Sequence, residues 1–232
     1  MKRRAALGWM LIALVAPATL PAAEKSAKGA KAGKGPARWE ETIRKFEAAD
    51  RENPPPKGVV LLVGGSNARR WTDVGTYFPE HTVINRGFGG ALMSDVLQFA
   101  DRIVIPYAPK AILLNAGGND LSSGKTPEQV RDVARAFFAK VRVALPAARF
   151  YQLAVPPVLR AAQSPESMAV IRRTNTLLAE LARTEKNVEF VDLFTAFLDE
   201  KGQPRTEFFV EDGTHFSPQG YAVVAGLLRG KL

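Results

Sequence analysis

Hydrophobic positions follow two alternating patterns along most of the chain. Five short runs are almost continuously apolar, as is typical of strands buried on both faces of a sheet. They lie at residues 58–63, 82–85, 111–114, 150–155 and 188–193. Between them, apolar residues recur at three- and four-residue spacing, which predicts amphipathic helices at residues 39–50, 93–105, 126–145, 167–184 and 218–228. This alternation predicts an α/β fold with about five parallel strands and helices on both faces of the sheet.

The N-terminal residues have a different pattern. A basic start, an apolar run at residues 5–16 and a Pro/Ala-rich end at residues 17–23 follow the order of a secretory signal peptide. Since the apolar run is shorter than the about 20 residues that a membrane-spanning helix needs, we expect cleavage and export to the periplasm or medium, without stable membrane insertion. Residues 24–37 are rich in Lys, Ala and Gly and predict a flexible linker, which leaves one domain at residues 38–232.

The charge of the chain is concentrated before this domain. The whole sequence has a formal net charge of +9, but residues 38–232 contain 25 basic and 22 acidic residues. The domain is therefore almost neutral, which argues against a nucleic-acid partner. The sequence has no cysteine and only two histidines, His81 and His215. These counts exclude disulfides and a cysteine nucleophile, and they make a zinc site built on several histidines unexpected.

Polar residues with catalytic potential follow several of the predicted strands. Ser66 comes after the first strand, a glycine-rich loop at residues 87–90 after the second, Asn119 after the third, and Asp212 with His215 after the last. Each has an ordinary structural alternative, as a helix cap or a turn residue. However, the carboxyl ends of parallel strands lie at one edge of a sheet, where ligands bind. The set as a whole therefore predicts an active site rather than five separate turns.

Other candidates are weaker. The glycines at residues 87–90 lack the later glycine and the lysine of nucleotide-binding loops. His81 precedes the second strand, so it is expected at the opposite end of the sheet. Arg86 has two interpretations, contact with an acidic substrate or support of the glycine loop, and the structural one is preferred. Residues 72–80 and 156–166 are expected to line the site from outside.

Four sequence blocks resemble the signature blocks of the SGNH (GDSL-like) hydrolases, in their order and approximate spacing. They lie at residues 64–67, 85–90, 117–120 and 212–215. The resemblance covers roughly residues 39–228 and implies a flavodoxin-like three-layer α/β/α sandwich. It also implies a catalytic triad and an oxyanion hole, the group of donors that stabilises the negative oxygen of the transition state. The triad would be Ser66, Asp212 and His215, and the oxyanion hole the backbone N–H groups of Ser66 and Gly90 with the Asn119 amide.

The sequence departs from the family pattern beside the nucleophile. Gly65 stands where the family's name-giving Asp is usual, and Asn67 where Leu is common, so substrate shape near Ser66 is in question. Gly89 is an alternative to Gly90 as the backbone donor. The resemblance implies an exported serine esterase acting on short-chain carboxylic esters, such as O-acetyl groups on carbohydrate or lipid, without metal or cofactor. The alternatives are an acyltransferase or thioesterase with the same triad, and a non-catalytic envelope-binding protein.

Overall fold

A computed structural model describes residues 35–232 of the chain. The predicted signal peptide and residues 24–34 of the predicted linker lie outside the described residues. The described part begins with a 3₁₀ turn, η1 (Pro36–Trp39), that runs directly into helix α1 (Glu40–Glu52). The first described element therefore begins two residues before the predicted domain boundary.

Five parallel strands form the central sheet, and each of the five predicted strands is confirmed. The strands are β1 (Val60–Gly64), β2 (Val83–Gly87), β3 (Ala111–Asn115), β4 (Arg149–Leu153) and β5 (Val188–Val191). Their order in the sheet is β2-β1-β3-β4-β5, and every neighbouring pair is parallel. This is the expected flavodoxin-like order, in which chain direction across the sheet reverses between β1 and β3.

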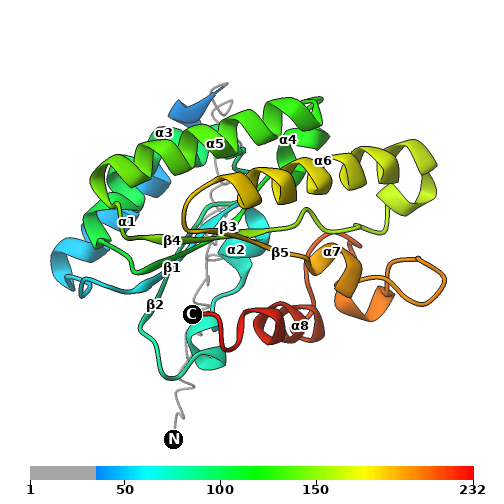
Figure 1. Cartoon of the computed structure of the whole chain (residues 1–232). Helices are drawn as coiled ribbons and strands as arrows, with labels where there is room; N and C mark the ends of the chain where they lie inside the picture. The colour runs from blue at the N-terminus through cyan, green and yellow to red at the C-terminus, as the bar shows by residue number, and fades with distance from the viewer. Residues whose placement is uncertain (1–34) are drawn as a thin grey trace, which may run out of the picture. The chain divides into compact units, whose positions relative to one another are not determined.

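Helices cover both faces of the sheet and complete a three-layer α/β/α sandwich (Figure 1). One layer contains α1, α3 (Met93–Ile103), α5 (Pro127–Ala144) and α6 (Pro165–Thr184). The other contains α2 (Ser66–Arg70), α7 (Leu193–Ala196) and α8 (Pro218–Leu228). Helix α4 (Gly118–Ser122) follows β3 directly, and short 3₁₀ turns lie at Val74–Tyr77, Ile105–Tyr107, Ala161–Gln163 and Thr206–Phe208. The sequence predicts the five long helices but not α2, α4 and α7, because four or five residues are too few to show a helical period.

The core consists of two apolar clusters, one on each face of the sheet. Successive strand residues point to opposite faces. Leu61 and Val63 accordingly pack under α3 and α5, whereas Val60 and Leu62 pack against the α7 and α8 side. All four side chains are fully buried. Burying such a side chain stabilises a fold by about 1.5–3 kcal/mol. Their burial on both faces explains why β1 reads as an unbroken apolar run.

Two searches within residues 35–232 bear on other kinds of function. No helix in that range combines the length and the apolar character needed to cross a membrane. Nor does the same range contain three or more His, Asp or Glu side chains grouped so that they could hold a metal ion.

Three strands end at the same level beside the point where the chain direction reverses. Gly64 at the end of β1 pairs with Gly87 of β2 and with Asn115 of β3. Gly64 has a φ of +144°, and a Cβ there would lie 1.9 Å from the carbonyl oxygen of Asn115. Only glycine fits this turn. The turn brings the segment that follows β1 to the same sheet edge as the loops after β2 and β3.

Candidate active site

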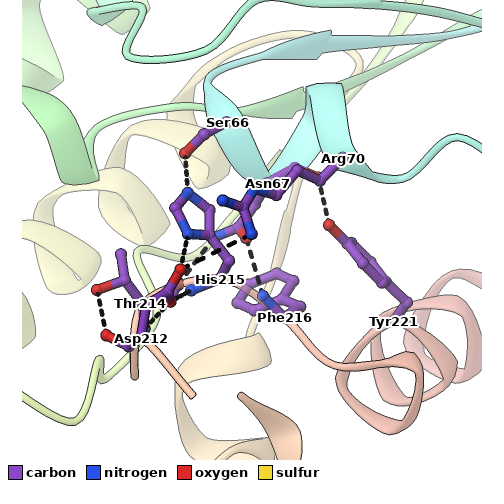
Figure 2. Close-up of polar contacts among 8 residues, drawn as sticks. All are labelled: Ser66, Asn67, Arg70, Asp212, Thr214, His215, Phe216 and Tyr221. Atoms are coloured by element: carbon purple, nitrogen blue, oxygen red, sulfur yellow. Dashed lines mark hydrogen bonds and ion pairs between the residues drawn. The ribbon is translucent and has the colours of Figure 1, made fainter. Parts of the chain in front are cut away.

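Ser66 is the first residue of α2, two residues beyond the end of β1. Its hydroxyl oxygen lies 2.8 Å from Nε2 of His215, within hydrogen-bonding distance (Figure 2). His215 comes from the loop before α8, 149 residues later in the chain. The fold therefore brings the predicted nucleophile and the predicted base into direct contact.

Asp212 binds the other nitrogen of the same imidazole. Its Oδ2 lies 2.6 Å from His215 Nδ1, and its Oδ1 accepts the backbone N–H groups of Thr214 and His215, both at 2.9 Å. These hydrogen bonds, that of the His215 amide foremost, hold the pKa of Asp212 well below its usual range. The ionised carboxylate accepts a hydrogen bond from Nδ1–H, which leaves Nε2 unprotonated and free to accept the Ser66 proton.

Asn67 ties the histidine loop to the nucleophile helix. Its side-chain oxygen accepts the backbone N–H of Phe216 at 3.0 Å, and its amide nitrogen donates to the carbonyl of Thr214 at 3.4 Å (Figure 2). The hydroxyl of Tyr221 donates to the backbone carbonyl of Asn67 at 2.9 Å. Asn67 therefore holds the backbone on both sides of His215, which gives this departure from the family pattern a structural role.

The candidate oxyanion donors meet at the same sheet edge. Ser66, Gly90 and Asn119 all line one cleft together with His215. The side-chain nitrogen of Asn119 donates to the carbonyl of Ala91 at 2.9 Å. Because an amide nitrogen carries two hydrogens, this bond fixes the side chain and leaves a second N–H for a ligand. Gly89 lines the cleft as well, so the choice of Gly90 stays a prediction.

A buried carboxylate that the sequence did not reveal anchors the loop that contains Gly90. Asp95 is 2% exposed, and its Oδ2 accepts hydrogen bonds from Arg38 at 3.1 Å, from the indole of Trp39 at 3.0 Å and from the backbone of Leu92 at 2.9 Å. Arg38 also donates to the carbonyl of Gly90 at 3.3 Å. The N-terminal 3₁₀ turn thus fixes the glycine loop through a shared carboxylate.

The cleft is open and has a volume of about 540 Å³. Its lining residues are Trp39, Thr42, Ser66, Arg69, Arg70, Gly89, Gly90, Asn119, Thr214 and His215. None of them comes from residues 72–80 or 156–166, so the expectation that these segments line the site is wrong. The outer wall comes instead from Trp39 and Thr42, at the start of the described chain. Phe78 of the first segment is part of the buried core, and Leu159 of the second packs against Gly213.

Two residues considered from sequence lie away from the cleft. His81 precedes β2, and its Nδ1 lies 3.0 Å from Nζ of Lys110, a residue that directly precedes β3. The side chain of Arg86 contacts Asp50 and donates to the Tyr107 hydroxyl at 2.6 Å. These contacts are structural, as preferred, but they join β2 to α1 and to Tyr107 instead of supporting the glycine loop.

The sequence from residue 63 to residue 223 matches the family model described as the GDSL-like Lipase/Acylhydrolase family. The chain belongs to the GDSL-like lipase/acylhydrolase family. Its activity is accordingly that of a carboxylic ester hydrolase. No curated protein matches the chain in sequence.

Solved structures share the fold of this acylhydrolase at low sequence identity. A Streptococcus pneumonia protein described as a platelet activating factor is 24% identical, with a TM-score of 0.74 over 83% of this chain and 91% of that chain. A GDSL-like lipase from Bacteroides thetaiotaomicron is 18% identical, with a TM-score of 0.66 over 82% of this chain and 96% of that chain. A catalytic mutant of the acetylxylan esterase Axe2 from Geobacillus stearothermophilus is 16% identical, with a TM-score of 0.61 over 75% of this chain and 94% of that chain.

The match to the family begins after α1, so part of the cleft lies outside it. Trp39 and Thr42, which form the outer wall, precede the matched residues, as does Arg38. Within the match, Gly65 departs from the usual acylhydrolase pattern, and its environment gives a reason. A Cβ at Gly65 would lie 2.8 Å from the side-chain nitrogen of Asn119. In this acylhydrolase, glycine at position 65 leaves room for the amide of Asn119.

Proposed function

We propose that the protein is an exported serine esterase that hydrolyses short-chain carboxylic esters, with Ser66 as nucleophile, His215 as general base and Asp212 as the residue that orients the histidine. The observation that carries this proposal is the continuous hydrogen-bonded chain from Ser66 Oγ through both nitrogens of His215 to Asp212, at 2.8 Å and 2.6 Å. Nucleophile, base and orienting carboxylate within these distances are the arrangement that activates a serine hydroxyl.

In the first step, Ser66 Oγ attacks the ester carbonyl carbon while its proton moves to Nε2 of His215. Asp212 is ionised at neutral pH and stabilises the imidazolium that forms, and its lowered pKa keeps the proton on the histidine. The tetrahedral intermediate then collapses. The bond from carbon to the alcohol oxygen breaks, the alcohol takes the proton from His215, and the acyl group remains on Ser66.

In the second step, water attacks the acyl group. His215 takes a proton from this water and returns one to Ser66 Oγ as the carboxylic acid leaves. In both steps the carbonyl oxygen becomes negative and accepts hydrogen bonds from the backbone of Ser66 and Gly90 and from the free N–H of Asn119. Donors that are held in place before the reaction stabilise this charge without reorganising, and losing one costs about a hundredfold to a thousandfold in turnover.

The composition of the cleft supports a short acyl group. Among the described residues that line it, there is no aliphatic side chain, and Trp39 is the one large apolar group. A long acyl chain would leave most of its apolar surface in water, because nothing in the cleft covers it. An acetylxylan esterase is among the structures that share this fold. O-acetyl groups on carbohydrate or lipid are therefore the proposed natural substrates.

Export rests on the sequence of residues 1–23, which have the three-part order of a cleavable signal peptide. An exported esterase would meet acylated envelope or environmental molecules. N-terminal sequencing of the protein recovered from periplasm or medium checks this part. A mature N-terminus close to Ala22 or Ala23 is expected, and an intact N-terminus on cell-associated protein would contradict export.

The esterase proposal is tested by hydrolysis of a nitrophenyl ester series from acetate to long chains. We expect turnover to be highest on the shortest esters and to fall at least about a thousandfold in Ser66→Ala, since no other group replaces the nucleophile. Ser167→Ala is the matched control, because Ser167 is exposed in the first turn of α6. Labelling with a fluorophosphonate, followed by peptide mass mapping, should place the adduct on Ser66.

Three results would contradict the proposal in different ways. Full activity in Ser66→Ala would refute the nucleophile. Labelling of Ser66 with release of acyl groups only when an alcohol, amine or thiol acceptor is added would indicate an acyltransferase with the same triad. A folded protein that neither hydrolyses any ester nor reacts with the label would indicate a non-catalytic binding protein.

A further inference from the structure

Two adjacent arginines, Arg69 and Arg70, line the cleft beside the nucleophile. They are the last two residues of α2, three and four positions after Ser66, and both are exposed. None of the triad's hydrogen bonds involves either side chain. The acyl-transfer chemistry described above therefore leaves two positive charges at the mouth of the site without a role.

The cleft contains no carboxylate that would neutralise both charges. No Asp or Glu is present among the described residues that line it. The one acidic partner is Asp212, whose Oδ2 lies 3.7 Å from Nη1 of Arg70. Within residues 35–232, the guanidinium of Arg69 has neither an ion pair nor a side-chain hydrogen bond, whereas Arg102 on α3 is bound by two glutamates.

The glycine loop fixes the place of the Arg69 head group. A Cβ on Gly89 would lie 2.7 Å from Nε of Arg69 and 3.4 Å from its Cζ. The guanidinium therefore lies against the bare backbone of Gly89, next to the predicted oxyanion donor Gly90. This position brings a planar, permanently charged group with several N–H donors to the rim of the reacting centre.

From this arrangement we infer that the site selects esters that carry an anionic group, a carboxylate or a phosphate, close to the ester bond. A guanidinium binds either group through paired, charge-assisted hydrogen bonds, which are stronger than neutral ones. Arg69 is the principal specificity residue, and Arg70 adds positive potential on the Asp212 side of the cleft. The inference rests on the proposed esterase function and narrows it to acylated, negatively charged molecules.

The test compares acetate esters that differ in charge: methyl 4-acetoxybenzoate is neutral, 4-acetoxybenzoate carries a carboxylate, and 4-acetoxyphenyl phosphate carries a phosphate. For wild type, Arg69→Gln, Arg69→Lys and Arg70→Gln, kcat/KM is measured on each ester by acetate release. We expect the ratio of anionic to neutral kcat/KM to fall about tenfold or more in Arg69→Gln, mainly through KM, and to recover partly in Arg69→Lys. The anionic ester whose kcat/KM falls more in Arg69→Gln identifies the preferred anionic group.

Arg183→Gln is the matched control. Arg183 is exposed in the last turn of α6, which leads to the start of β5 at the opposite end of the sheet, and the substitution removes the same charge. It should leave the ratio unchanged. Moderate salt should lower the wild-type ratio, because salt screens exposed charges.

An unchanged ratio in Arg69→Gln, including an equal loss on all three esters, would overturn the inference. An equal loss would mean that Arg69 supports the glycine loop instead of binding substrate. Failure of the underlying function has a separate signature. If Ser66→Ala retains hydrolysis of the neutral ester, or if wild type cleaves none of the three, the proposed esterase mechanism is wrong and this inference falls with it.

Discussion

Replacing Gly65 by alanine tests how closely the oxyanion donor depends on its neighbour. The backbone of Gly65 has a φ of −84°, outside the positive range in which glycine is favoured. The added Cβ would lie 2.8 Å from the side-chain nitrogen of Asn119, whereas ordinary contacts begin at 3.4 Å. The Asn119 amide must therefore move by roughly half an ångström, away from a position fixed by its 2.9 Å bond to Ala91.

This steric conflict should lower activity more than it lowers stability. The displaced atom is the end of a side chain, so the backbone of α4 need not shift, and we expect the free energy of unfolding to change by less than about 1 kcal/mol. Deleting an oxyanion donor costs about a hundredfold to a thousandfold in turnover. Because the donor here is displaced and not deleted, we expect kcat of Gly65→Ala to fall about tenfold to a hundredfold, with little change in KM.

The assay is steady-state hydrolysis of 4-nitrophenyl acetate, combined with urea unfolding of the same preparations. Gly226→Ala is the control, since a Cβ at Gly226 in α8 would meet no atom within 4 Å. That variant should keep wild-type kcat and gain about 0.4–1 kcal/mol in stability. Wild-type kcat in Gly65→Ala would refute the assigned role of Asn119. A stability loss of several kcal/mol would show that the backbone, not the amide, gives way.

Three further predictions concern His215 and its partners. Asn67→Ala leaves the Phe216 amide without its acceptor, so the histidine loop loosens, and kcat should fall about tenfold at unchanged KM. Asn67→Asp restores the acceptor and should recover part of the lost kcat. Equal kcat in the two variants would contradict a positioning role for Asn67. Asp212→Asn should lose about 10⁴-fold in kcat. Because the folded-state pKa of Asp212 is lowered, its ionised form stabilises the fold above its unfolded pKa of about 3.9, and this stabilisation is lost as pH falls further. Urea unfolding from pH 7 to pH 3 should show that wild type is more stable than Asp212→Asn by at most about 1 kcal/mol, because the carboxylate is 43% exposed and water screens its charge. This difference in stability should shrink below pH 4. A difference that grows below pH 4 would contradict the expected direction of the pH dependence.

The fold was predictable because the burial of a strand or helix determines its pattern of apolar residues. Strands covered on both faces must be apolar at every position, as Leu61 and Leu62 show for β1, and each predicted strand lies within two residues of an observed one. The short helices show no such pattern. Helix α2 contains Ser66, Asn67 and two arginines among its five residues, so its composition reflects the site and not a buried face.

The meeting of Ser66, His215 and Asn119 was predictable for a topological reason. Each follows a strand or precedes the last helix, and a parallel sheet gathers such positions at one edge. The anchoring of the glycine loop by Arg38, Trp39 and Asp95 had no comparable sign. It joins residues that are 56 and 57 positions apart, and an Asp in the first turn of a helix commonly serves its own helix. Only the structure shows that this carboxylate also binds the N-terminal turn.

The residues on either side of the nucleophile have roles that sequence comparison alone would miss. Gly65 and Asn67 both depart from the usual family pattern, which suggests changes in substrate shape. In the structure, however, Gly65 leaves room for the Asn119 amide, and Asn67 holds the loop of His215. Both therefore act on the partners of Ser66, so their replacement should lower kcat first. Arg69, on the same helix, faces the open cleft and should alter KM first. This division of effects within five consecutive positions separates the chemistry of the site from its selectivity.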